Sequence, residues 1–140
     1  LLATRRQQPA LRRRRFLHGS RLRAIGARDI IWLRADGGEM LHADWHDPQL
    51  HALGLILHGA AIAETDRRGE PVVGDTLALL LNADPDEVAF SLCGHVEHAC
   101  TQWTTLVDTS APPANRGYVW AAGDEVLVPG RSLILLAESR

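Results

Sequence analysis

The chain has 140 residues, 46% of them hydrophobic, and a formal net charge of −2 at pH 7. This length fits one domain that buries a single core, and the composition excludes a disordered chain. No apolar run approaches the roughly 18 residues needed to cross a bilayer, so we expect no membrane partner. The basic N-terminus leads into no apolar stretch, so we expect no signal peptide and a cytoplasmic location.

Positive charge is concentrated at the N-terminus. Residues 1–28 hold nine of the fifteen arginines and no acidic residue, and the chain contains no lysine. Such a segment could bind nucleic acid or another anionic surface. The aromatic side chains that would stack on bases are missing there, apart from Phe16. We therefore favour a solvated helix face, docked against an acidic partner domain, and expect no nucleic-acid partner.

The first 28 residues predict a short helical region followed by a connector. Leu1–Gln8 has a helical composition, Pro9 interrupts the helix, and Leu11–Leu17 can resume it. Gly19–Arg28 is predicted to be the connector. A helix this short is marginal alone and needs a surface to lie on. No capping residue precedes Leu1, so we expect the polypeptide to extend further upstream.

From Asp29 onward the sequence predicts β-strands separated by turns. A turn is expected at Asp36-Gly37-Gly38, a single helical turn at Asp44–Leu50, and loops at Glu64–Asp75 and Ala111–Gly117. The expected strands are Ile30–Leu33, Leu53–His58, Thr76–Asn82, Val88–Leu92, Trp103–Asp108, Glu125–Val128 and Ser132–Ala137. Short strands at this spacing predict a mainly β protein, an antiparallel β-sandwich preceded by a short N-terminal helix.

Alternation within the strands predicts which side chains share a face. Leu77, Leu79 and Leu81 should point one way, and Ala78 and Leu80 the other. In the next strand Val88, Phe90 and Leu92 should share a face, and further along Trp103, Thr105 and Val107 should lie together.

Two turns suggest hairpins. Thr76–Asn82 should pair with Val88–Leu92 around Asp84-Pro85-Asp86. Glu125–Val128 should pair with Ser132–Ala137 around Pro129-Gly130.

A cluster of possible metal ligands follows the first strand, formed by His42, Asp44, His46 and Asp47. Histidine and carboxylate side chains at short intervals do bind metals. The spacing H-x-D-x-H-D matches no dedicated zinc site or facial triad, however. We therefore interpret the cluster as a polar turn, with Asp44 near a helix cap and Trp45 as its buried anchor.

A second candidate metal site lies between Cys93 and Cys100, with His95, Glu97 and His98 between them. Four such ligands could hold a structural zinc ion, but the single-residue spacers are shorter than usual. The alternative is a loop between strands whose cysteines are incidental. A disulfide between the two cysteines is sterically possible, although without a secretion signal we expect reduced thiols.

No catalytic motif is present. The sequence lacks a G-x-S-x-G elbow, a phosphate-binding loop and a dinucleotide fingerprint. The carboxylates lie in turns or loops with no evident apolar pocket that would separate their pKa values. The four tryptophans could stack on sugar rings, but large aromatic side chains more often pack, so we expect packing for each of Trp32, Trp45, Trp103 and Trp120.

Taken together, these segments resemble a known family: the C-terminal end of bacterial glycogen debranching enzymes of the isoamylase type, in the α-amylase superfamily. The opening LLATRRQQPALRRRRFLHG is similar to the last helix of the family's catalytic (β/α)8 barrel, and DIIWLRADGGEMLHADWHDP to the passage from barrel to sandwich. LGLILHG, VVGDTLALLLNADPDEVAFSL, WTTLVDT and PGRSLILL resemble its C-terminal β-sandwich strands in order. The resemblance covers essentially the whole chain.

The resemblance implies a non-catalytic fragment of a larger enzyme. Members cleave α-1,6-glucosidic branch linkages in glycogen with a retaining pair of carboxyl groups, which sit on barrel strands. Those strands would lie upstream of Leu1, so no catalytic, cofactor or metal-binding residue is assigned to this chain. Residues 1–28 would be the remnant of the last barrel helix plus connector, and 29–140 the sandwich domain.

The implied partners are the catalytic barrel and, through the parent enzyme, glycogen. Without the barrel, some apolar side chains of the N-terminal segment should be less covered than core residues: Leu2, Leu11, Phe16 and Leu17. Two alternatives remain open. One is an autonomous α-glucan-binding module, which needs at least two tryptophans exposed on one face. The other is a small zinc-stabilised interaction domain built on Cys93, His95, His98 and Cys100.

Overall fold

The structure, a computed structural model, describes residues 1–21, 26–92, 102–111, 116–121 and 123–139. One α-helix, α1 (Leu2–Gln7), precedes three short 3-10 turns: η1 (Pro9–Arg12), η2 (Asp44–His46) and η3 (Gly59–Ala61). The strands are β1 (Ile30–Leu33), β2 (Ala52–Leu57), β3 (Leu77–Asn82), β4 (Val88–Ser91), β5 (Gln102–Asp108), β6 (Val119–Ala121), β7 (Glu125–Val128) and β8 (Ser132–Ser139). No helix among these residues is long and apolar enough to span a membrane.

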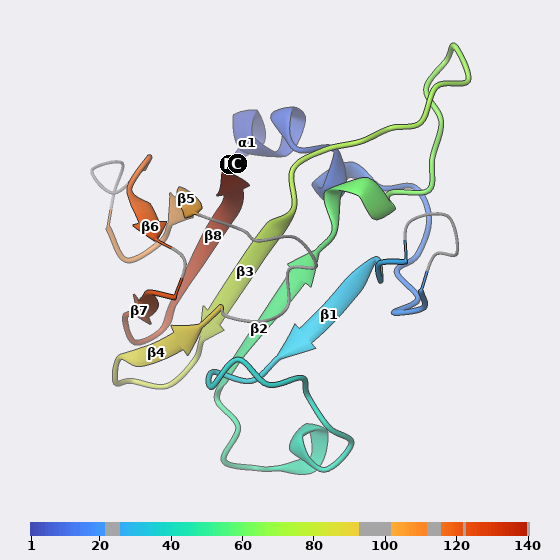
Figure 1. The fold of residues 1–140 in the computed structure, drawn as a ribbon. Coiled ribbons are helices and arrows are strands. Elements are labelled where there is room, and N and C mark those ends of the chain that lie inside the picture. The colour runs from blue at the N-terminus through green and yellow to red at the C-terminus, as the bar shows by residue number, and fades with distance from the viewer. Residues whose placement is uncertain (22–25, 93–101, 112–115, 122, 140) are drawn as a thin grey trace.

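The strands form two antiparallel sheets (Figure 1). The large sheet has the order β1-β2-β3-β8-β5-β6, and the small sheet consists of β4 and β7. The predicted class, a mainly β antiparallel sandwich with a short N-terminal helix, is confirmed. Every predicted strand is present within a few residues of its expected bounds. The short strand β6 was not predicted, because its three residues lack the length for an alternating pattern.

Both predicted hairpins are wrong. β3 pairs with β2 and β8, whereas β4 pairs with β7 in the other sheet. The chain therefore changes sheet at Asp84-Pro85-Asp86 and changes back at Pro129-Gly130. These two crossings lie against each other, since a Cβ on Gly130 would stand 1.9 Å from the carbonyl oxygen of Pro85. Alternation identifies the buried face of a strand but carries no information about its hydrogen-bonded neighbour.

The first hydrophobic core fills the space between the two sheets. Phe90 of the small sheet packs there with Ala78 and Leu80 of β3, and all three are fully buried. The other buried members are Ile31, Leu33, Ile56, Leu92, Trp103, Val126, Val128, Ile134 and Leu136. The predicted division of β3 into two faces is confirmed, because Leu77 and Leu79 belong to a separate cluster.

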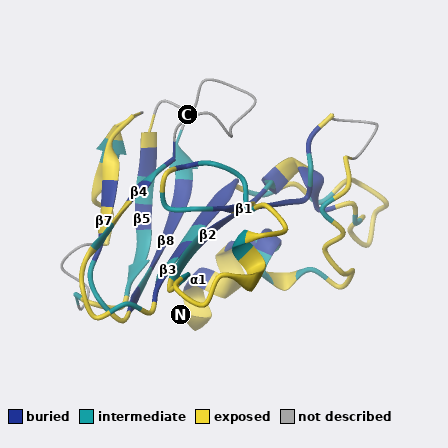
Figure 2. Ribbon diagram, turned by 90° about the horizontal axis from the view of Figure 1, so that it is seen from below, coloured by how far each residue is buried: buried dark blue, intermediate teal, exposed yellow. Residues whose placement is uncertain are grey.

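The second core lies on the opposite face of the large sheet, and the N-terminal segment covers it (Figure 2). Its buried members are Ala10, Ile30, Leu55, Leu57, Ile62, Leu77, Leu135 and Ala137. Hydrogen bonds hold the covering segment in place: Gln8 donates to the Asp75 carboxylate at 2.8 Å. The Asp29 carboxylate accepts from the backbone N–H groups of His18 and Gly19 and lies 3.5 Å from Arg13.

The predicted second helical turn at Leu11–Leu17 is wrong beyond Arg12. Pro9 opens the turn η1, a position where its missing N–H costs nothing, and η1 ends at Arg12. Beyond it, backbone N–H groups donate to distant carboxylates in place of earlier carbonyls. Glu64 accepts from Arg14 at 2.6 Å. Tertiary acceptors thus replace the helical hydrogen bonds.

One strand changes face along its length. In β5 the register shifts between Thr105 and Val107, which leaves Leu106 without a direct partner across the strand pair. Trp103 belongs to the first core, and buried Thr105 accepts a hydrogen bond from Trp120, which packs against that core, whereas Val107 packs on the second. The prediction that these three side chains lie together is therefore wrong at Val107, because a β-bulge inverts the alternation.

Candidate functional site

The most unusual surface of the described chain lies at the β1 edge of the large sheet. Trp32 is 37% exposed and Trp45 is 48% exposed, and their rings meet edge to face with centroids 5.3 Å apart. Ile30 packs in the second core and both Ile31 and Leu33 in the first, so Trp32 points to the second-core side of the sheet. The two indoles extend the apolar surface of that face to its edge.

Backbone hydrogen bonds fix the loop that carries Trp45. The N–H of Arg34 donates to Gly38, and the N–H of Met40 donates back to Trp32 at 2.9 Å. Gly37 has a φ of +85°, as the predicted Asp-Gly-Gly turn requires. The loop is therefore an ordered extension of strand β1.

Turn η2 presents Trp45 to solvent instead of burying it. Asp44 accepts from the N–H of Leu41 at 2.7 Å, and Arg34 lies 3.6 Å from the same carboxylate. The cap residue is Ala43, which has no side chain that could accept a hydrogen bond. The prediction of Trp45 as a buried anchor is wrong, since the indole is 48% exposed and packs edge to face on Trp32, which is itself exposed.

The predicted cluster of metal ligands is a set of turn contacts. His42 and His46 pack edge to face with ring centroids 4.8 Å apart. Asp44 is used within the turn, and Asp47 accepts from the N–H of Gln49. Among the residues that the structure describes, no group of three or more His, Cys, Asp or Glu side chains could hold a metal ion. The Cys93–Cys100 candidate lies outside these residues, and its zinc and disulfide interpretations remain predictions.

The other two tryptophans pack as predicted. Trp103 is buried in the first core. Trp120 is half-buried, donates its Nε1–H to Thr105 at 3.1 Å and contacts the ring of Tyr118. For Trp32 and Trp45 the expectation of burial is wrong. Exposure of these two depended on what covers the second face, which the local pattern does not encode.

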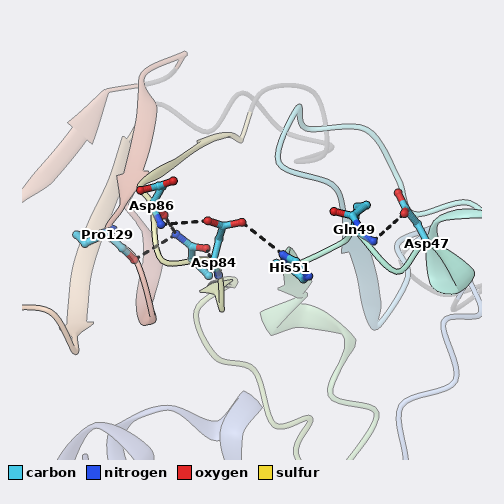
Figure 3. A network of polar contacts seen from close by, with 7 residues as sticks. Asp47, Gln49, His51, Asp84, Asp86 and Pro129 are labelled. Carbon is cyan, nitrogen blue, oxygen red and sulfur yellow. Dashed lines mark hydrogen bonds and ion pairs between the residues drawn. The ribbon is translucent and has the colours of Figure 1, made fainter.

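A polar network at the turn that follows β3 supports the crossing between the sheets (Figure 3). Asp84 accepts from the backbone N–H of Asp86 at 3.0 Å and lies 3.4 Å from Nδ1 of His51. The N–H of Asp86, followed by contact with His51, lowers the pKa of Asp84. Buried Asn82 donates to the carbonyl oxygen of Val128 at 3.0 Å, which joins the large sheet to the small one.

Among the residues that the structure describes, three carboxyl groups, those of Asp36, Glu64 and Asp84, have a lowered pKa and are thus stabilised as anions. A backbone hydrogen bond from Gly38 is the main cause of the lowered pKa of Asp36, and one from Arg14 is the main cause for Glu64. For Asp84 the main cause of the lowered pKa is likewise a backbone hydrogen bond, from Asp86. A general acid that cleaves glycosidic bonds needs the opposite, a raised pKa. These groups therefore stabilise turns and loops and are unsuited to acid catalysis.

The N-terminal segment adds a second exposed apolar surface. Leu1 and Phe16 are each 87% exposed, and Leu2 and Leu17 are also exposed. Low coverage of Leu2, Phe16 and Leu17 agrees with the prediction. Leu11 packs against the second core but is only half-buried, so it is also less covered than the core residues, as predicted.

Comparison with known proteins finds the same kind of relative over nearly the whole chain. The family model for the isoamylase C-terminal region matches residues 29–140. A Mycobacterium tuberculosis protein named "Glycogen operon protein GlgX homolog" is 38% identical over 136 residues, which are 96% of this chain and 19% of that protein. The homologue of the same name in Mycobacterium bovis matches equally. The chain thus spans about a fifth of the length of these relatives.

A solved structure supports the fold. The pullulanase of Anoxybacillus sp. LM18-11, determined in complex with maltotetraose, superimposes with a TM-score of 0.53 and 11% identity. The match covers 99% of this chain and 14% of the pullulanase. At this identity the likeness concerns the fold alone. The described β-sandwich is therefore an architecture that a larger carbohydrate-active enzyme also contains.

Proposed function

The chain belongs to the isoamylase C-terminal family, and from this premise we propose that it is the C-terminal domain of an enzyme that hydrolyses α-1,6-glucosidic branch linkages during glycogen breakdown. One observation carries the proposal: 38% identity over 136 residues to a protein named for the glycogen operon, within a family match over residues 29–140. A protein acting on glycogen stores would be cytoplasmic.

In this proposal the chain supports catalysis without performing it. Retaining glycosidases need two carboxyl groups about 5 Å apart, one of them a general acid with a raised pKa. Within the described ranges, the pKa values of Asp36, Glu64 and Asp84 are shifted, and each is shifted downward. Catalytic residues would lie in a (β/α)8 barrel elsewhere in the parent, and none of the described residues is assigned a catalytic, cofactor or metal role.

The proposed division places residues 1–28 with the barrel as its last helix and connector, and 29–140 as the sandwich. The start of the family match at residue 29 supports this boundary. The exposed apolar residues of the N-terminal segment also support it, because they would face the rest of the barrel.

An enzyme assay tests the proposal. Purified 140-residue chain is incubated with glycogen, and the release of reducing ends is measured beside a longer polypeptide that includes the region upstream of Leu1. We expect no debranching from the isolated chain and clear activity from the longer one. Debranching by the isolated chain, or a longer protein that leaves α-1,6 linkages intact, would contradict it.

A second candidate is an autonomous α-glucan-binding module, favoured by the exposed pair Trp32 and Trp45. Two neighbouring indoles could stack on successive glucose rings, with the nearby imidazoles of His42 and His46 as polar partners. Titration with maltoheptaose, followed by tryptophan fluorescence, tests this. Saturable quenching that Trp45→Ala abolishes and Trp120→Ala retains would favour the module, and a flat titration would reject it.

A further inference from the structure

A row of aromatic side chains runs out of the first core at strand β6, which forms the edge of the large sheet opposite β1 (Figure 1). Trp103 is buried in the first core, and Trp120 lies directly opposite it in the register of β5 and β6. Tyr118 stands two residues before Trp120, on the same side of the sheet. The two rings meet at an interplanar angle of 65°, with centroids 4.7 Å apart. Tyr118 is 57% exposed, so the row ends in solvent.

Hydrogen bonds to one residue of β5 fix the position of this aromatic pair. Thr105 accepts the indole Nε1–H of Trp120 at 3.1 Å, so the polar edge of the indole is satisfied within the protein. The backbone N–H of Thr105 donates to the carbonyl oxygen of Tyr118, and the N–H of Gly117 donates to that of Thr105, both at 2.8 Å. The exposed ring is therefore preorganised, and a ligand that stacks on it would lose little affinity to ordering the site.

We propose that Tyr118 and Trp120 form a secondary α-glucan-binding site, at which successive glucose units of a glycogen chain stack on the two rings. The inference rests on the proposed function, which supplies the glucan, and adds a second place at which the same polymer binds. The pair lies on the first-core side of the sheet, whereas the N-terminal segment covers the second core. A barrel that continues from that segment would leave the pair open to solvent.

The angle between the two rings favours an α-glucan over other glucose polymers. The C–H face of a glucose unit is apolar and stacks on an aromatic ring, while its hydroxyl groups remain in water. An α-1,4-linked chain curves, so its successive glucose rings are not coplanar, whereas a β-1,4-linked chain is nearly flat. Two aromatic rings inclined at 65° can each contact one unit of a curved chain. They cannot both lie along one face of a flat chain.

The surroundings of the pair favour a sugar over a protein partner. Arg116 precedes Tyr118 by two residues, and Asp124 contacts the end of β6 by accepting from the N–H of Ala121. Both charged residues are exposed, so the aromatic surface is small and has polar borders along the chain. A stable protein interface buries about 800 Å² on each partner, far more than two rings supply. A few glucose units match a surface of this size.

Affinity electrophoresis in native gels that contain glycogen tests the proposal on the 140-residue chain. We expect glycogen to slow wild type and Tyr118→Phe, which keeps the ring, whereas Tyr118→Ala should bind at least about tenfold more weakly. Val119→Ala is the matched control, because Val119 is 46% exposed on the same strand but points to the other side of the sheet. It should migrate like wild type. Equal retardation of Tyr118→Ala and wild type, or a wild type that glycogen does not slow, overturns the proposal.

A titration followed by tryptophan fluorescence adds a measurement on wild type itself. Maltoheptaose should change the emission at millimolar concentration, as expected for a shallow site, and cellohexaose, a β-1,4-linked chain, should not. An equal response to both sugars overturns the proposal. So does a maltoheptaose response that Trp45→Ala abolishes and Tyr118→Ala retains, because it would assign binding to the surface of Trp32 and Trp45.

Debranching of glycogen by the longer polypeptide tests the proposed function separately. If that polypeptide leaves α-1,6 linkages intact while binding depends on Tyr118, the glucan site is retained and the proposed function is rejected. If it debranches glycogen while wild type is not slowed in the gel, the function is retained and the glucan site is rejected.

Discussion

The two faces of the large sheet are built from the same strands but differ in how completely other parts of the chain cover them. The face toward β4 and β7 is closed by the chain itself, and Leu80 is fully buried there. The opposite face is closed at one end only, so the adjacent Leu81 remains half-buried. A strand with leucine on both faces needs a layer on each side. The comparison shows that one face of this sheet is fully covered by the described residues and that the other is covered only in part.

The two layers that cover the large sheet, the small sheet and the N-terminal segment, are also held by different interactions. The small sheet is held by strand pairing and by the buried amide of Asn82. The N-terminal segment is held by single carboxylates, Asp29, Glu64 and Asp75, that accept hydrogen bonds from it. Local opening should therefore begin at the N-terminal segment and spare the first core.

The largest expected difference comes from neighbouring leucines in β3. Leu80→Ala removes a fully buried side chain from a closed core and should lower the free energy of unfolding by about 3 kcal/mol. Leu81→Ala should cost about 1 kcal/mol, because the side chain is only half-buried and its cavity opens to solvent. Urea unfolding followed by circular dichroism measures both. Equal losses would show that the second face is closed as firmly as the first.

A smaller loss is expected at the junction of the two sheets. Asn82→Ala leaves the carbonyl oxygens of Asp86 and Val128 without their donor, which should cost about 2 kcal/mol. The effect should appear in the same unfolding curve. A cost near zero would mean that strand pairing alone holds the small sheet. His51→Ala, at the exposed end of the network, is the control and should change stability little.

Removing the carboxylate of Asp29, which anchors the N-terminal segment, should mainly destabilise that segment. Asp29→Asn weakens the acceptor for His18 and Gly19 and removes the charge beside buried Arg13. We expect a global loss of about 1–2 kcal/mol, with much faster tryptic cleavage in the arginine run at residues 12–15. Mass spectrometry of the first fragments identifies the site. Unchanged cleavage there would place the weakest point of the molecule elsewhere.

The smallest expected effect is a loss of stability of the N-terminal segment at low pH. A backbone N–H from Arg14 lowers the pKa of Glu64 below its ordinary value. The anion therefore stabilises the segment above the unfolded pKa, and this contribution disappears as the pH falls through the folded value. Below about pH 4 tryptophan-independent probes such as hydrogen exchange should show the segment opening before the sheets. In Glu64→Gln the segment should already exchange faster at pH 7 and lose that acid step.

The lowered pKa of Asp84 predicts the matching acid step at the sheet junction. Asp84 and Glu64 are both partly exposed carboxylates, so the two steps compare the junction and the segment under one condition. If the sheet junction and the N-terminal segment opened at the same pH, this would contradict the expectation that the segment opens first.

Local sequence was sufficient to place most of the elements. Alternation of Leu77 to Leu81 marks two faces of one strand whatever lies on them, and the glycine at position 37 marks a turn because it accepts positive φ. The aromatic surface could not be found this way. Trp32 and Trp103 stand in similar strand patterns, yet one is exposed and the other buried.

The sequence by itself determined where the strands and turns fall and which side chains share a face, because those properties depend on neighbours along the chain. The tertiary structure alone decided that β4 pairs with β7, that the bulge after Thr105 moves Val107 to the second core, and that Trp45 faces solvent. These outcomes depend on pairing and coverage between segments many residues apart. An alternating pattern specifies that a face must be covered, whereas the covering layer is chosen by the assembled fold.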